Sequence, residues 1–117
     1  MPVSTEPPCK TVEGVRRALE DIEPGLSKHY KIGPDPTLKG VMLVREGNSI
    51  ISTPRSYGGD EGLYEVCPRK DGKGFKELLG TRSDVAGWLS LEEAVFIAEA
   101  TARLPVKLLK PIAEKYF

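Results

Sequence analysis

The first apolar pattern in the chain has the spacing of a helix. Its positions are separated by three, four and three residues, and they are Val12, Val15, Leu19 and Ile22. Thr11 has the residue type of an N-cap, and Pro24 and Gly25 end the pattern, so we expect an amphipathic helix over 11–22. Ahead of it, residues 1–9 hold adjacent prolines and no periodic pattern, and we expect a disordered tail there.

The middle of the chain has the pattern of β-strands. Two apolar runs, 41–44 and 49–52, flank a turn in which Gly47 and Asn48 tolerate positive φ. This combination predicts an antiparallel hairpin.

Further strands are predicted after the hairpin. Residues 63–67 alternate like a half-buried strand that stops at Pro68, and 75–79 predict another short strand. The stretch over 24–40 is rich in proline and glycine, so we expect an irregular connection. The whole region therefore predicts an antiparallel sheet of three to four strands.

The C-terminal third has two helical segments. Ser90 and Glu93 have the spacing of a capping box, and the apolar positions that follow predict a helix from 91 to about 104. Pro105 can open a second helix, in which Pro111 predicts a kink or two short turns.

These elements predict a single α+β domain over residues 10–117, with an N-terminal helix, the sheet and two C-terminal helices packed on it. A chain of 117 residues with 39% hydrophobic side chains is long enough to bury a core. No apolar run approaches the roughly 20 residues that span a bilayer, and the start lacks a signal-peptide core. We therefore expect no membrane contact and an intracellular protein, either nuclear or cytoplasmic.

Residue types that carry catalysis are scattered along the chain. The two cysteines, Cys9 and Cys67, lack metal-ligand spacing, and the one histidine, His29, lies in a predicted loop. The glycine-rich stretches match no phosphate-binding motif, and no nucleophile motif is present. We therefore expect no enzymatic activity, no metal, no cofactor and no small-molecule substrate.

Charge is balanced in total but not along the chain. The sequence has 17 lysines and arginines and 17 aspartates and glutamates, which argues against binding nucleic acid through bulk charge. Residues 65–82 nevertheless carry a net charge of plus two, 84–99 are acidic, and the segment from Arg103 is basic again. Such a basic turn either contacts RNA phosphates or is a solvated hairpin tip. The candidate RNA contacts are Arg55, Arg69, Lys70, Lys73 and Lys76.

One stretch resembles a known family. It runs Gly72-Lys73-x-Phe75-Lys76, then Gly80, then Gly87-Trp88-Leu89-Ser90-Leu91-Glu92-Glu93-Ala94-Val95-Phe96-Ile97. It is similar to the N-terminal region of tRNA splicing endonuclease subunits, above all to the non-catalytic structural subunit. The helix over 11–22 and the hairpin ending in Thr53-Pro54-Arg55 also look like that domain.

The resemblance implies a non-catalytic scaffold or RNA-positioning module of an RNA-processing assembly. It implies that Lys73 and Lys76 lie near a tRNA precursor, and that the sheet and helix brace a partner subunit. The catalytic residues of the family belong to a C-terminal nuclease domain, so the resemblance assigns none to this sequence.

Two other functions stay open. The chain is alternatively a small adaptor that binds only protein, or a DNA-binding regulator that uses its last two helices in the manner of a helix-turn-helix. The candidate residues for a partner interface are aromatic: Trp88, Phe96, Tyr116 and Phe117. Phe96 falls on the polar side of its helix, so we expect either the loop over 81–87 or a partner protein to bury it.

Overall fold

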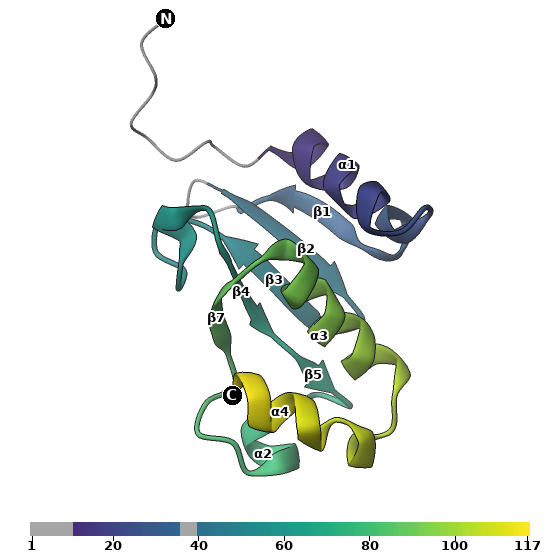
Figure 1. Ribbon diagram of the computed structural model, residues 1–117, viewed down its shortest axis with the longest axis vertical. Coiled ribbons are helices and arrows are strands. Elements are labelled where there is room, and N and C mark those ends of the chain that lie inside the picture. The colour runs from purple at the N-terminus through teal and green to yellow at the C-terminus, as the bar shows by residue number, and fades with distance from the viewer. Residues whose placement is uncertain (1–10, 36–39) are drawn as a thin grey trace, which may run out of the picture.

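The protein has the α+β architecture that the sequence pattern predicts. The computed structural model describes residues 11–35 and 40–117, in which a helix precedes a five-stranded antiparallel sheet and two helices follow it (Figure 1). The strands lie in the order β1-β2-β3-β4-β7. They are β1 (Lys31–Pro34), β2 (Val41–Arg45), β3 (Asn48–Ser52), β4 (Tyr64–Cys67) and β7 (Ala86–Leu89). The predicted tail over 1–9, with Cys9, lies outside the described residues.

Helices, 3-10 turns and a small hairpin complete the described chain. The α-helices are α1 (Val12–Ile22), α2 (Phe75–Leu79), α3 (Leu91–Arg103) and α4 (Lys110–Tyr116). The 3-10 turns are η1 (Leu26–His29), η2 (Gly59–Glu61) and η3 (Val106–Leu108), and the hairpin pairs β5 (Arg69–Lys70) with β6 (Lys73–Gly74). None of the described helices has both the length and the apolar character that crossing a membrane requires.

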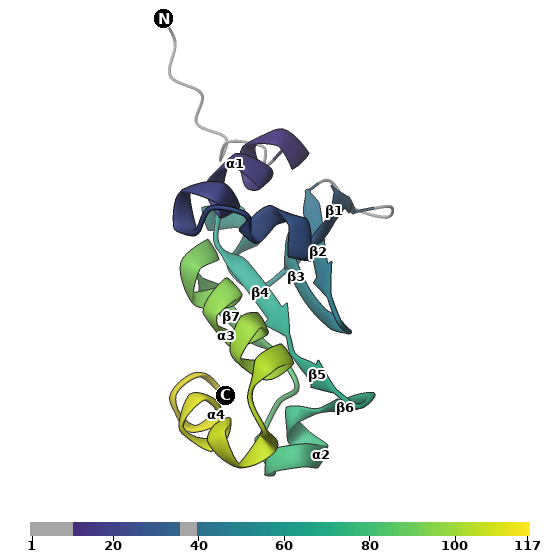
Figure 2. The same cartoon turned by 90° about the vertical axis from the view of Figure 1, so that its right-hand side faces the viewer.

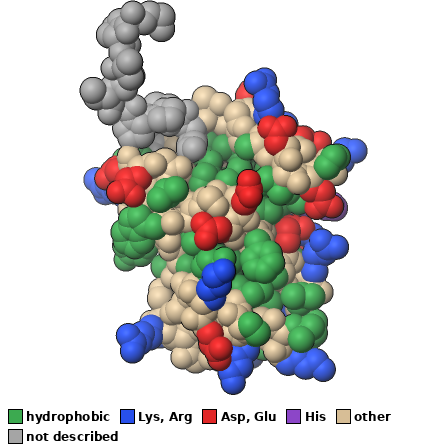
Figure 3. All heavy atoms as spheres, viewed as in Figure 1, with side chains coloured by type: hydrophobic (Ala, Val, Ile, Leu, Met, Phe, Trp, Pro, Cys, Tyr) green, Lys and Arg blue, Asp and Glu red, His purple; other side chains and the backbone are tan. Residues whose placement is uncertain are grey.

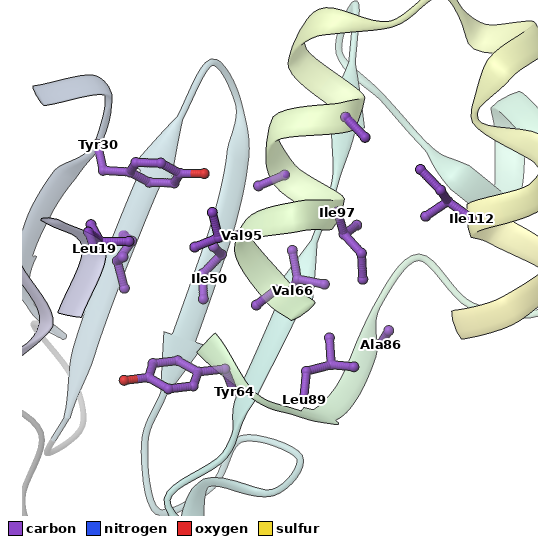
Figure 4. Packing of buried hydrophobic residues seen from close by; sticks show 14 of the residues in the cluster. Leu19, Tyr30, Ile50, Tyr64, Val66, Ala86, Leu89, Val95, Ile97 and Ile112 are labelled. Carbon is purple, nitrogen blue, oxygen red and sulfur yellow. The ribbon is translucent and has the colours of Figure 1, made fainter. Parts of the chain in front are cut away.

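The core lies between one face of the sheet and the helices α1 and α3, which cover that same face (Figure 2). Successive side chains of a strand point to opposite faces, so alternate strand residues enter the core. Fully buried Ile50 and Val66 belong to one apolar cluster with Leu19 of α1 and Ile97 of α3 (Figure 4). No described helix covers the opposite face, where the intervening strand residues are half-buried.

The hairpin of β2 and β3 is confirmed, and so is positive φ at Gly47, but the second such residue is Glu46 rather than Asn48. Positive φ angles occur at Glu46 (47°) and Gly47 (86°), which gives the two-residue loop the twist that suits a tight hairpin. Asn48 is buried instead. Its side-chain nitrogen donates to the carbonyl oxygen of Arg45 at 3.0 Å, and its oxygen accepts from the backbone N–H of Arg69 at 3.0 Å. Asn48 therefore ties the hairpin to the start of β5.

Two of the five strands fall where composition predicts loops, so the expected three to four strands are too few. β1 includes Gly33 and Pro34, and β7 begins within the predicted loop over 81–87. Both strands lie at an edge of the sheet. A proline or an irregular register is tolerated there because an edge strand has hydrogen-bonded neighbours on one side only.

Residues 75–79 form α2, so the predicted strand there is wrong. Phe75, Leu78 and Leu79 occupy positions i, i+3 and i+4, and a run this short fits a helical turn as well as a strand. Phe75 is fully buried, and Gly80 ends the helix in a left-handed conformation at φ 71°. Residues 75–79 therefore form a helical turn that buries the Phe75 ring in the core.

The predicted helix boundaries are confirmed. Thr11 caps α1 through its side chain, and Ser90 and Glu93 form both halves of a capping box at the start of α3. Pro111 lies in the first turn of α4, where its missing N–H removes no helical hydrogen bond. The segment after Pro105 consequently divides into two short turns, η3 and α4.

Replacing Ser90 by alanine removes the hydroxyl that accepts from the Glu93 N–H at 3.1 Å. We expect Ser90→Ala to lose about 1 kcal/mol of unfolding free energy in urea denaturation, because a helix donor loses its partner. Ser90→Asp keeps an acceptor at the N-cap and should unfold with nearly the wild-type free energy. Equal stability of Ser90→Ala and the wild type would mean that the capping box does not stabilise α3.

Glu20 fixes the corner between α1 and η1. Its carboxylate oxygens accept from the backbone N–H groups of Ser27 at 2.9 Å and Gly25 at 3.0 Å, and these bonds lower its pKa from the ordinary value. A lowered folded-state pKa means that the carboxylate stabilises the fold at neutral pH. That contribution is lost as the pH falls through the folded-state pKa.

We therefore expect Glu20→Gln to lower the melting temperature at pH 7, with the difference from the wild type shrinking as the pH falls below about 4. Thermal melts over a pH series measure this. Asp21→Asn is the matched control, because the Asp21 carboxylate accepts no hydrogen bond within the described part of the chain. A difference between Glu20→Gln and the wild type that stays constant down to pH 2 would contradict the assignment.

Candidate functional site

The candidate RNA contacts divide between the two ends of β4. Arg69 and Lys70 form β5, Lys73 lies in β6 and Lys76 lies in α2, all beyond the point where β4 leaves the sheet. Arg55 lies in the connection that enters β4, at the far end of this strand (Figure 1). The structure thus brings four of the five residues together and separates Arg55 from them.

A second basic segment joins these four residues. α4 packs against α2, and the ring of Phe117 lies 4.9 Å from that of Phe75, so residues 106–117 meet residues 69–84 at one end of the molecule. We call these two segments the basic end. Its eight basic residues are Arg69, Lys70, Lys73, Lys76, Arg82, Lys107, Lys110 and Lys115. The same two segments contain only four acidic residues. The other described residues include seven basic and twelve acidic side chains.

The cations of the basic end are open to solvent. Lysine and arginine side chains surround the lower end of the face seen in Figure 3, and most carboxylates on that face lie above them. Seven of the eight basic residues are exposed. Lys70 is half-buried, because its Nζ donates to the carbonyl oxygen of Thr101 near the end of α3 at 2.9 Å. None of the eight forms an ion pair with another described residue.

The four aromatic candidates for a partner interface differ in exposure. Trp88 on β7 is 60% exposed and Phe96 on α3 is 53% exposed, so the loop over 81–87 does not bury Phe96 as expected. Phe96 projects outward because α3 turns its buried positions toward the sheet. Tyr116 and Phe117, at the end of α4, are half-buried against the core.

Trp88 forms an exposed stack with Tyr57, and we call these two residues the aromatic pair. Their ring centroids are 5.2 Å apart, the planes differ by 20°, and Tyr57 is 50% exposed. The Trp88 N–H donates to the carbonyl oxygen of Tyr57 at 3.1 Å, and the Tyr57 N–H donates to Glu65 Oε1 at 3.2 Å. Glu65 alternates with buried Tyr64 and Val66, so it belongs to the uncovered face of the sheet. The aromatic pair therefore lies at that face, beside the start of β4.

The backbone is strained where it holds the aromatic pair. Trp88 has a φ of 53°, a left-handed conformation that costs a non-glycine residue roughly 1–3 kcal/mol. Two glycines make room for the stack. A Cβ on Gly58 would lie 2.9 Å from the Trp88 Cα, and a Cβ on Gly87 would lie 2.1 Å from the Tyr57 Cβ. The stack is exposed, so its burial offsets little of this strain. Uncompensated backbone strain of this size occurs most often at sites that bind ligands.

A buried carboxylate connects three elements on the core side of the sheet. Glu99 of α3 accepts from the hydroxyl of Tyr30, just after η1, at 2.8 Å, and from Nε of Arg45 at the end of β2. The Arg45 and Glu99 side chains are only 12% and 15% exposed. Burial and the hydrogen bond to Glu99 raise the pKa of Tyr30, and the hydrogen bond to Glu99 raises the pKa of Arg45. Both donors therefore keep their protons at neutral pH.

A pocket of about 450 Å³ opens beside this cluster, between the corner of α1 and η1 and the C-terminal part of α3. Its wall includes Glu99 and His29. Both hydrogen bonds that Glu99 accepts end on Oε2, and the nearest cation to Oε1 among the described residues is Nη1 of Arg103 at 3.9 Å. His29 is exposed and has no hydrogen-bond partner among the described residues. No hydrogen bond joins Glu99 to His29 within the described part of the chain.

Other reactive groups are isolated as well. No three histidine, cysteine, aspartate or glutamate side chains converge to hold a metal ion within residues 11–35 and 40–117. Burial raises the pKa of the Cys67 thiol, which makes it a weak nucleophile at neutral pH.

Sequence reasoning misses the roles of Glu99 and Tyr57. Glu99 lies on the polar side of an amphipathic pattern, where a buried carboxylate looks the same as a solvated one. For Tyr57 the signal is the glycines, Gly58 after it and Gly87 before Trp88. Glycine next to an aromatic residue indicates a close approach of two backbones.

Comparison of the chain with protein families, with curated proteins and with solved structures found no match in any of the three.

Removing the Glu99 carboxylate takes away the hydrogen-bonded partner of Arg45 and leaves it only the exposed carboxylate of Glu46, 3.6 Å from its Nη1. We expect Glu99→Ala to lose about 3 kcal/mol of unfolding free energy in chemical denaturation, as is typical when one partner of a buried ion pair is removed. Arg103→Ala should change the stability by less than about 0.5 kcal/mol, because Arg103 is 67% exposed and lies 3.9 Å from Glu99. Similar losses in the two variants would contradict a special role for the buried pair.

Proposed function

We propose that this chain is a non-catalytic RNA-positioning module of an RNA-processing assembly. The observation that carries the proposal is the basic end, where residues 69–84 and 106–117 contribute eight lysines and arginines to one end of the molecule. Contacts of such side chains with phosphates supply much of the affinity of proteins for nucleic acids. Because the total charge of the chain is zero, the local excess rather than the sum provides the attraction.

The resemblance in sequence supports the same surface. Lys73 and Lys76 belong to the element that resembles the structural subunit of tRNA splicing endonucleases, and both are exposed at the basic end. We propose Arg69, Lys73 and Lys76 as phosphate contacts and add Lys110 of α4. Lys70 instead positions β5 against α3 through its hydrogen bond to Thr101.

The test is a titration of labelled single-stranded RNA, and of a tRNA, at several salt concentrations. We expect the triple variant Lys73→Gln/Lys76→Gln/Lys110→Gln to bind both RNAs more weakly. For single-stranded RNA, the slope of log affinity against log salt should decrease in magnitude by about 2, because each lost phosphate contact removes about 0.7. A thermal melt establishes that the variant is folded.

The matched control is Arg16→Gln/Arg17→Gln/Lys28→Gln, which removes the same charge from α1 and η1. Its salt slope should equal that of the wild type. Equal slopes for the two triple variants, or no binding of either RNA at low salt, would overturn the proposal. Tighter binding of duplex DNA than of RNA would also count against it and would favour the helix-turn-helix alternative.

A protein-binding role is the second candidate, and the aromatic pair is the observation that favours it. An exposed stack held by a strained backbone suits contact with another protein, because aromatic side chains are enriched at interfaces. The two roles are compatible in a scaffold. Leu89 pairs with Tyr64 at the start of β4, so the aromatic pair lies at one end of this strand and the basic end begins beyond the other.

A further inference from the structure

We infer that the aromatic pair receives a positively charged segment of a partner protein, in which an arginine or lysine stands next to an apolar residue. This inference goes beyond the RNA contact proposed above, since it assigns a different ligand chemistry to a different surface.

The exposure of the rings suits a cation. Trp88 and Tyr57 are 60% and 50% exposed although they stack on each other, so ring surface of both stays open to solvent. A guanidinium or ammonium group is attracted to the face of an aromatic ring, most strongly to that of tryptophan. An arginine side chain adds its planar stacking surface, and a neighbouring apolar residue can contact the half-buried strand residues beside the pair.

The surrounding charge selects the sign of the ligand. Asp60 and Glu61 lie in η2, directly after Gly58, whose Cα faces the Trp88 backbone. Glu65 accepts the N–H of Tyr57, and Arg55 is the one cation among residues 53–66. Three carboxylates against one cation give the segment that carries Tyr57 a net negative charge, which attracts a cationic side chain and repels the phosphates of RNA.

The aromatic pair is also fixed before a ligand arrives. The Trp88 N–H bond to the Tyr57 carbonyl and the close approach of Gly87 to Tyr57 fix the backbone positions from which the two rings project, and the rings stack on each other. A surface that is already ordered loses less conformational entropy on binding. The strained conformation of Trp88 thus holds the rings in position in the free protein.

Trp88 emission provides a direct test, because the chain has one tryptophan. The probe is a blocked pentapeptide of sequence Gly-Arg-Leu-Arg-Gly, compared with Gly-Glu-Leu-Glu-Gly. We expect a saturable change in emission with the arginine peptide and none with the glutamate peptide. Tyr57→Leu should weaken arginine-peptide binding about two- to fivefold, the effect typical of one exposed cation–aromatic contact.

Phe96→Leu is the matched control for Tyr57→Leu, because Phe96 is 53% exposed and has no ring partner among the described residues. It should bind the arginine peptide as the wild type does. A second pair of variants tests the charge without altering the rings. Asp60→Asn/Glu61→Gln should weaken binding, and Glu13→Gln/Asp21→Asn on α1, with the same charge change, should not.

Several outcomes would overturn the inference: no saturable response, equal responses to the two peptides, or equal binding by the two carboxylate variants. An emission change with RNA but not with the arginine peptide would assign the rings to base stacking instead. Self-association in sedimentation experiments, accompanied by a concentration-dependent shift of Trp88 emission, would assign the rings to a second copy. The Lys73→Gln/Lys76→Gln/Lys110→Gln variant should keep peptide binding, so failure of the RNA proposal and failure of this one are distinguishable.

Discussion

The buried carboxylate of Glu99 is the contact on which the arrangement of the elements depends. Apolar packing of a helix on a sheet is non-directional, so by itself it tolerates sliding and rotation. Hydrogen bonds from Tyr30 and Arg45 to one carboxylate have fixed directions, and they join η1, β2 and α3 in a single register. Because burying charge has a large desolvation cost, this pair is better explained by specificity of packing than by net stability.

The orientation of α3 determines which surfaces the molecule presents. Its buried side faces the sheet and leaves Phe96 exposed to solvent. Near its C-terminal end, the carbonyl oxygen of Thr101 accepts a hydrogen bond from Lys70. That contact holds β5 under α3, and the packing of α4 on α2 then completes the basic end. In the roles proposed for them, the basic end would attract a ligand through charge over several ångströms, and the aromatic pair would hold a ligand through direct contact with its rings. A scaffold that positions RNA against a partner protein needs surfaces of both kinds.

The sequence by itself determined the elements that depend on neighbours along the chain. Helical periodicity with a cap predicts α1 and α3, turn chemistry predicts the hairpin of β2 and β3, and alternation predicts β4. Pro111 predicts the division of the last segment, since a proline excludes a helix interior but not a first turn. The uneven distribution of charge was also visible, because it needs only counting along the chain. All of these properties are local, so the order of the residues is sufficient to specify them.

Only the tertiary structure decided the rest. The edge strands β1 and β7 contain residues that composition assigns to loops, and the helix α2 depends on burial of Phe75. The sequence also did not show which basic side chains share one surface. In the structure Lys70 is bonded to Thr101 of α3, and Arg55 lies at the far end of β4 from the other candidates. The stack of Tyr57 on Trp88 joins segments thirty-one positions apart, and the glycines beside them indicate a close approach without specifying its partner. The physical reason is common to all: contacts between distant segments follow from packing of the whole chain, and local propensity carries no information about them.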